Sequence, residues 1–207
     1  MRIITTIFAT LFLGTASLMA QTPEEIVRKM SEQLDRADVE GFTMDLNMKL
    51  PILGTIHSHN LVFRDKLKVE ASNKTMKKTS WTNATTKWVY APDTNEIIIT
   101  AKEVTSTSDG NNLSRFEAIA ERYTLKLQKE TADAWYIICK KAKANKDKDD
   151  PKKMELAVAK DTYLPIYLRA KKSVVAVSIE NVTLGVTEES VTFDPAEFPD
   201  ATIIDKR

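Results

Sequence analysis

Residues 41–50, Gly-Phe-Thr-Met-Asp-Leu-Asn-Met-Lys-Leu, alternate between apolar and polar side chains from Phe42 onwards. Successive side chains of a strand point to opposite faces, so this pattern predicts a half-buried strand over 42–50. Two of its apolar residues are methionines, Met44 and Met48. Their unbranched thioethers suit irregular or changing packing, which makes this face the first candidate for a binding surface.

A helix is expected just before this strand. Pro23 fits the first helical position and Thr22 is a plausible N-cap. An apolar stripe at helical spacing follows, ending before Gly41, and consists of Ile26, Val27, Met30 and Leu34.

After residue 50 the chain reads as short strands separated by turns. They are expected at 55–64, 67–71, 74–81, 86–90, 96–101, 123–129, 135–141, 154–159, 166–171 and 174–179, with short closing segments at 182–184, 191–193 and 202–204. A second amphipathic helix is expected at 113–120, and the charged stretch 143–153 should be a solvated hairpin tip. The pattern predicts a mainly β (α+β) fold: an unclosed antiparallel β-barrel or half-barrel of about eleven strands, with helices covering an apolar cavity.

Large apolar side chains are in surplus for such a sheet. Either they form an ordinary core, or they line a cavity that holds an apolar ligand. The candidate lipid-binding residues are Met44, Leu46, Met48, Trp81, Trp88 and Tyr90 on the strands, with Phe116 and Ile119 on the covering helix.

The N-terminus has the order of a secretory signal: Arg2, a short apolar run, small residues, then polar sequence. We expect residues 1–20 to be a cleaved signal peptide and 21–207 to form one domain. Cleavage after Ala20 is favoured, and cleavage after Ala16 is the alternative. The one cysteine, Cys139, lies far from either position, so we expect neither N-terminal lipidation nor an intramolecular disulfide, and a buried, inert thiol.

Composition and motifs give little support for an enzyme or a nucleic-acid-binding protein. The whole chain has 30 basic and 29 acidic residues and 5 glycines, so neither a basic surface nor a glycine-rich phosphate loop is expected. His57 and His59 could share a metal site on one strand, but no third ligand is suggested, and surface histidines are the simpler interpretation. We expect no catalytic residue, no metal and no cofactor.

Four stretches resemble the LolA-like outer-membrane lipoprotein carriers of bacteria. They are Gly41–Leu46 after the opening helix; Leu61–Arg64 with Lys68–Glu70; the Trp88-Val-Tyr90-Ala-Pro92 stretch; and Tyr163–Ile166, which leads to Phe193-Asp-Pro195, Phe198-Pro199 and Ile204–Arg207. Together they span nearly all of 21–207.

The resemblance implies a periplasmic, monomeric, non-enzymatic carrier that shields acyl chains of lipoproteins or other lipids and shuttles them towards the outer membrane. An inner-membrane transporter would load it and an outer-membrane receptor would unload it. The resemblance also implies that Arg64 holds a lid, although Asp65 replaces the proline usual in the family and an Arg64–Asp65 surface pair is the alternative. A periplasmic sensor or interaction module on the same fold, and a hydrolase, are the other functions considered.

Overall fold

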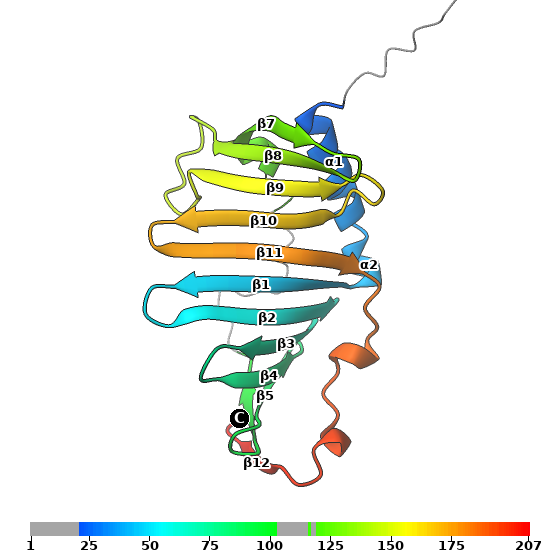
Figure 1. Ribbon diagram of the computed structural model, residues 1–207. Coiled ribbons are helices and arrows are strands. Elements are labelled where there is room, and N and C mark those ends of the chain that lie inside the picture. Colours follow the sequence, from blue (N-terminus) through cyan, green and yellow to red (C-terminus); the bar gives the residue numbers. More distant parts are fainter. Residues whose placement is uncertain (1–20, 103–115, 117–118) are drawn as a thin grey trace, which may run out of the picture.

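The chain folds into one twelve-stranded sheet with the strand order β12-β6-β5-β4-β3-β2-β1-β11-β10-β9-β8-β7 (Figure 1). The computed structural model describes residues 21–102, 116 and 119–207, so the predicted signal peptide lies outside the described residues. The strands are β1 (Phe42–Leu50), β2 (Gly54–Phe63), β3 (Lys66–Ser72), β4 (Lys77–Thr82), β5 (Thr86–Ala91), β6 (Glu96–Ala101), β7 (Tyr123–Glu130), β8 (Ala134–Lys141), β9 (Lys153–Ala159), β10 (Pro165–Lys172), β11 (Val175–Leu184) and β12 (Thr202–Asp205).

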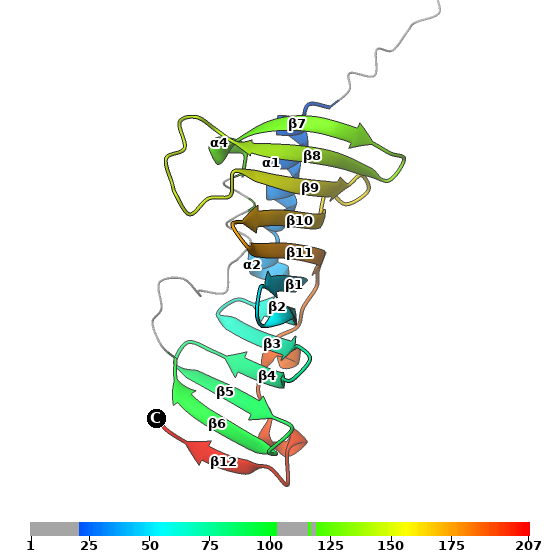
Figure 2. The ribbon, with the colours of Figure 1, turned by 60° about the vertical axis from the view of Figure 1, so that its left-hand side comes forward.

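The sheet curls into an unclosed half-barrel, as the sequence predicts, with β7 at one edge and β12 at the other (Figure 2). Two details differ from the prediction. There are twelve strands, and β12 pairs with β6 in parallel, whereas every other pair is antiparallel. A parallel pair needs a long crossover, which residues 102–201 supply.

The opening helix α1 (Pro23–Leu34) begins as predicted. Thr22 and Glu25 form a capping box: the Thr22 hydroxyl accepts from the Glu25 backbone N–H, and the Glu25 carboxylate accepts from the Thr22 N–H. The helix ends earlier than expected, at Leu34, and the short α2 (Ala37–Glu40) follows before Gly41. Within the described ranges, no helix is long and apolar enough to cross a bilayer.

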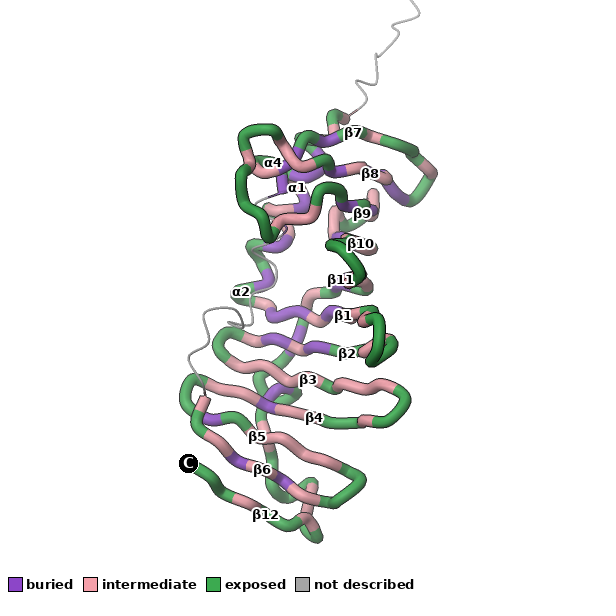
Figure 3. The backbone as a smooth tube through the Cα atoms, turned by 90° about the vertical axis from the view of Figure 1, so that its left-hand side faces the viewer, coloured by how far each residue is buried: buried purple, intermediate pink, exposed green. Residues whose placement is uncertain are grey.

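The main core forms where α1 packs on the sheet (Figure 3). The four apolar side chains of the α1 stripe are each at most 2% exposed. They share one cluster with Phe116, with Ile119 of α4 (Ile119–Arg122), and with residues of β1, β2 and β7 to β11. The strands therefore contribute one face to this core, as their alternating sequences require.

The C-terminal third departs from the predicted strand pattern in two places. Segments 174–179 and 182–184 form the single strand β11, because the break around Asn181 is a bulge, with φ +54° at Asn181, opposite β1. Segment 191–193 is not a strand: its first residue, Val191, is the buried last residue of the 3-10 helix η1 (Glu189–Val191). A second 3-10 helix, η2 (Pro195–Glu197), precedes β12.

Gly41 occupies a tight position between α2 and β1. Its φ is +66°, and an added Cβ would lie 2.7 Å from the Val62 carbonyl oxygen and 2.9 Å from the Val186 Cβ. We expect Gly41→Ala to lower the free energy of unfolding by at least about 1–3 kcal/mol, because backbone strain and this clash both act against the folded state. Gly54→Ala is the control, because Gly54 has a φ of +75° but no atom within 4 Å of the added Cβ. Chemical denaturation of both variants checks this, and equal losses of stability would contradict the clash.

Cys139 is fully buried in the main core, and burial raises its pKa to about 12. At pH 8, only about one thiol in ten thousand would be ionised, and the thiolate is the reactive form. We therefore expect a thiol reagent to modify the native protein only as fast as the protein unfolds, and the denatured protein at the rate of a free cysteine. Rapid modification under native conditions would show that the site opens.

Candidate functional site

The face of β1 that carries Phe42, Met44, Leu46 and Met48 is called the helix face here, because it packs against α1. Phe42 and Met44 are 3% and 1% exposed and belong to the main core, whereas Leu46 and Met48 are only half-buried. Phe116 and Ile119 of the predicted set are fully buried in the same cluster. The structure thus brings five of the eight predicted residues to one side of the sheet.

The three aromatic residues of the predicted set point to the opposite face. Trp81 pairs with Lys68, Lys68 pairs with Leu61, and Leu61 pairs with Thr43. Thr43 alternates with Met44 along β1, so Trp81 cannot share the face of Met44. The predicted lining residues therefore do not surround one common cavity.

These aromatic residues hold the C-terminal segment against the sheet. The Trp81 ring meets Phe193 and Phe198 edge-on, at centroid distances of 5.3 and 5.7 Å. Trp88 stacks on Phe193 at 5.4 Å, and Tyr90 lies 4.6 Å from Phe198. Such pairs add to the burial of apolar area, so this cluster anchors the chain between β11 and β12.

A cavity of about 690 Å³ opens on the helix face over β9, β10 and β11. The floor is apolar and is formed mainly by Met154, Leu168, Ala170, Val175, Val177 and Ile179. On the neighbouring strand, Leu46 pairs with Ile179 and Met48 pairs with Val177. The half-buried part of β1 thus continues the floor of the cavity.

The rim of this cavity is charged. Arg122, just before β7, pairs with Asp150 at 2.9 Å (Nη2–Oδ2) and also with Asp147. Lys172, at the end of β10, pairs with Asp149 at 2.7 Å (Nζ–Oδ1). The three aspartates belong to the connection between β8 and β9, for which the sequence predicts a solvated hairpin tip. This connection is exposed, and it also forms one side of the cavity.

Tyr123 adds a neutral polar group to the rim. Burial raises its pKa to about 12, and the nearby Asp150 carboxylate acts in the same direction. The phenol therefore stays uncharged at neutral pH. An apolar floor beneath a rim of paired charges suits an amphipathic ligand with a long apolar part.

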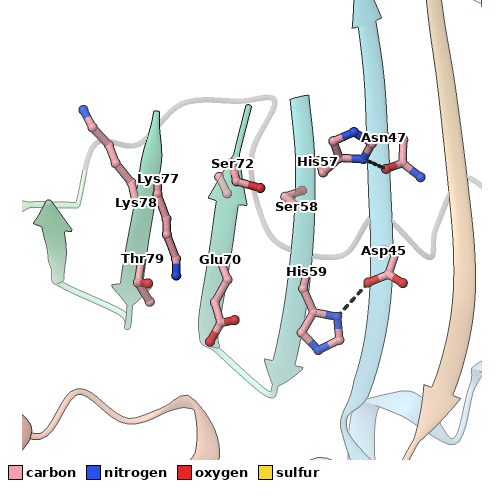
Figure 4. Close-up of a pocket in the computed structure, with 11 residues that line it drawn as sticks. Asp45, Asn47, His57, Ser58, His59, Glu70, Ser72, Lys77, Lys78 and Thr79 are labelled. Carbon is pink, nitrogen blue, oxygen red and sulfur yellow. Dashed lines mark hydrogen bonds and ion pairs between the residues drawn. The ribbon is translucent and has the colours of Figure 1, made fainter. Parts of the chain in front are cut away.

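The two histidines lie on the opposite face, in a polar pocket of about 380 Å³ (Figure 4). His57 Nδ1 is 2.6 Å from Asn47 Oδ1, and His59 Nδ1 is 2.7 Å from Asp45 Oδ1. Asn181 donates to the other oxygen of Asp45 at 2.8 Å. In the part of the chain that the structure describes, no group of three or more His, Cys, Asp or Glu residues could hold a metal ion.

Asp45 is the residue of this network whose pKa is shifted. Burial raises its pKa, but the hydrogen bonds from Asn181 and His59 outweigh that effect, so the pKa lies below the ordinary 3.8. The carboxylate stays ionised at neutral pH. Its partner His59 is largely exposed, so the pair contributes little to stability.

Arg64 is exposed in the two-residue turn between β2 and β3, with φ +53°. Its guanidinium lies over the Phe63 ring, 5.1 Å from the centroid. Among the described residues it forms neither a hydrogen bond to a helix nor an ion pair with Asp65. Its role in holding a lid remains a prediction.

The sequence reasoning missed most of the residues that form the cavity floor. Val175, Val177 and Ile179 alternate with polar or small residues along β11, which is the same signal that identified β1. The expected strand at 174–179 contains all three residues, but alternation alone does not show which face of the sheet opens into a cavity. Met154 and Leu168 carry no local signal, because their place beside the cavity depends on the pairing of β9 with β10 and of β10 with β11.

Comparison with known proteins finds no matching family model and no matching curated relative. Solved structures do match. An uncharacterized conserved protein from Thermus thermophilus is 14% identical, with 90% of this chain and 100% of that chain covered and a TM-score of 0.48. A LolA superfamily protein from Nitrosomonas europaea is 12% identical, with 86% and 100% covered and a TM-score of 0.34. MucB, in a complex with MucA(peri), is 10% identical, with 84% and 60% covered and a TM-score of 0.46. These likenesses concern the fold alone, so the function has to be argued from the cavity itself.

Proposed function

We propose that this protein is a periplasmic carrier that binds the acyl chains of lipoproteins, or of other lipids, and shuttles them towards the outer membrane. The observation that carries the proposal is the cavity on the helix face. Its volume of about 690 Å³ falls within the roughly 300–1,000 Å³ of small-molecule sites. Its apolar floor continues onto half-buried Leu46 and Met48.

The energetics of acyl burial fit a carrier. Each buried methylene contributes about 0.8 kcal/mol, so burying about ten of them gives roughly 8 kcal/mol. The net affinity is smaller than this sum, because association costs several kcal/mol of translational and rotational freedom. A receiver with a larger apolar site can then take the chain over.

The partners follow from the sequence resemblance and from the predicted signal peptide. Export would place the protein between two membranes, where an inner-membrane transporter loads it and an outer-membrane receptor unloads it. A carrier of this kind needs no catalytic group. The paired charges at the rim would face the polar part of the cargo while the floor holds the acyl chain.

Substitution of the floor tests the proposal. We expect Met48→Asp and Val177→Asp each to weaken binding of an acylated peptide about tenfold or more, because an unpaired charge would lie beside the chain. Both side chains are half-buried, so both variants should fold. Titration with a fluorescently labelled acylated peptide, and native mass spectrometry for co-purified lipid, measure the effect.

The matched control is Ile138→Asp, which places the same charge at a half-buried position on the opposite face, beside Glu155. It should leave acyl binding unchanged. If all three variants bind like the wild type, the cavity is not the site. If the wild type carries no lipid and crosslinks in cells only to proteins without acyl chains, the sensor or interaction module is the better function.

A further inference from the structure

Three large apolar side chains are exposed at two hairpin turns. Ile52 and Leu53, between β1 and β2, are 96% and 65% exposed, and Val174, between β10 and β11, is 64% exposed. Single exposed apolar residues are ordinary on protein surfaces, but an exposed group at one place usually marks an interaction site.

The sheet register brings these two turns together. Lys49 of β1 pairs with Ala176 of β11, and Lys172 of β10 pairs with Val175. The turn at 51–53 and the turn at 173–174 therefore project from the same end of neighbouring hairpins, as Figure 1 shows. Ile52, Leu53 and Val174 are called the apolar tip below.

Basic residues lie on one side of the apolar tip. A groove of about 560 Å³ on the opposite face, beside the same turns, is lined by five basic residues and one acidic residue: Lys49, Lys152, Lys153, Arg169, Lys171 and Glu155. Lys153 pairs with Glu155 at 2.8 Å, and Arg169 pairs with Glu180 at 2.9 Å. Lys49, Lys152 and Lys171 are exposed, and none of them forms an ion pair with another described residue.

The acidic residues nearby are engaged in ion pairs on the helix face. Asp149 pairs with Lys172, and Asp147 and Asp150 share Arg122. In the groove on the opposite face, the charged residues without an ion-pair partner among the described residues are all lysines. Exposed apolar side chains flanked by unpaired lysines match an anionic lipid surface, which takes up the apolar groups and attracts the cations.

The apolar tip also lies next to the cavity. Lys172, Ser173 and Val175 line the cavity, and Val174 is the next residue in the same turn. A surface bound at the tip would therefore lie close to the mouth of the cavity.

We infer that the apolar tip and its lysines form a docking surface for an anionic lipid bilayer. The protein binds the membrane reversibly, with Ile52, Leu53 and Val174 inserted among the lipids and Lys49, Lys152 and Lys171 facing the headgroups. The docking surface itself stands on exposure and charge. Its use, which is to bring the cavity to the membrane where acyl chains are exchanged, rests on the proposed carrier function.

Vesicle binding tests the docking surface. We expect the purified protein to sediment with vesicles of phosphatidylethanolamine and phosphatidylglycerol, more weakly as salt is added, and not with vesicles of phosphatidylcholine alone. The triple variant Ile52→Ser, Leu53→Ser, Val174→Ser should lower the partition coefficient about tenfold or more, since it removes the inserted apolar area. Lys49→Glu and Lys171→Glu should each lower it about fivefold or more.

The matched controls are Val39→Ser on α2 and Ile203→Ser on β12, which are 73% and 55% exposed and lie away from the tip. They should bind vesicles like the wild type. If the tip and control variants bind alike, or if the wild type does not bind the anionic vesicles, the inference is overturned. If the apolar tip crosslinks to a membrane protein and the wild type does not bind vesicles, the inference is also overturned, and the tip is a protein interface.

Acyl binding is measured on the same variants in solution, with an acylated peptide and no vesicles. The tip variants should keep wild-type affinity, because none of the three side chains lines the cavity floor. Loss of vesicle binding with acyl binding intact would support the docking surface. Wild-type vesicle binding without any acyl binding would leave the docking surface standing and remove the carrier function.

Discussion

The structure depends on a mismatch between one short helix and one wide sheet. The α1 helix has 12 residues, about 18 Å of length, whereas twelve strands side by side span roughly 50 Å. A single helix of that length can bury only part of an apolar sheet face. The buried core includes residues of β1, β2 and β7 to β11, whereas Leu46, Met48 and Val177, nearer the hairpin turns at 51–53 and 173–174, are only half-buried. The cavity lies at that transition.

The apolar side chains on the two faces of the sheet are covered by different parts of the chain. On the helix face, α1 and the residues around Ile119 form the main core, and the remaining apolar floor opens into the cavity. On the opposite face, a second apolar cluster forms near β4 to β6, where Phe193 and Phe198 of the C-terminal segment pack on Trp81 and Trp88. Ring-to-ring contacts hold this second cluster together, with Trp81 buried and Trp88, Phe193 and Phe198 half-buried. The polar pocket of His57 and His59 lies between these regions.

Part of the fold could be predicted from the sequence, because it depends on residues that are close together in the chain. The strand at 42–50 and the capped start of α1 follow from alternation and from a Thr22–Glu25 capping box, which are properties of neighbouring residues. The face of the sheet on which Trp81 and Trp88 lie could not be predicted from neighbouring residues. Their hydrophobicity predicts burial, but the face they occupy is set by strand pairing and by Phe193, more than a hundred residues away. The prediction of a strand at 191–193 is wrong for a related reason, since a 3-10 turn that buries Val191 and directs Phe193 to Trp81 has the same spacing of apolar residues.

The parallel pairing of β12 with β6 has a consequence for how the protein is made. Thr202 pairs with Glu96, about a hundred residues earlier in the chain, so β6 has no neighbour on one side while the intervening residues are being synthesised. During that interval the run Ile97–Ile98–Ile99 is an unprotected edge that other strands could join. Contacts so distant in sequence also form slowly. Folding of this half of the sheet can therefore finish only after β12 has emerged, and a chaperone that shields β6 until then would prevent intermolecular strand pairing.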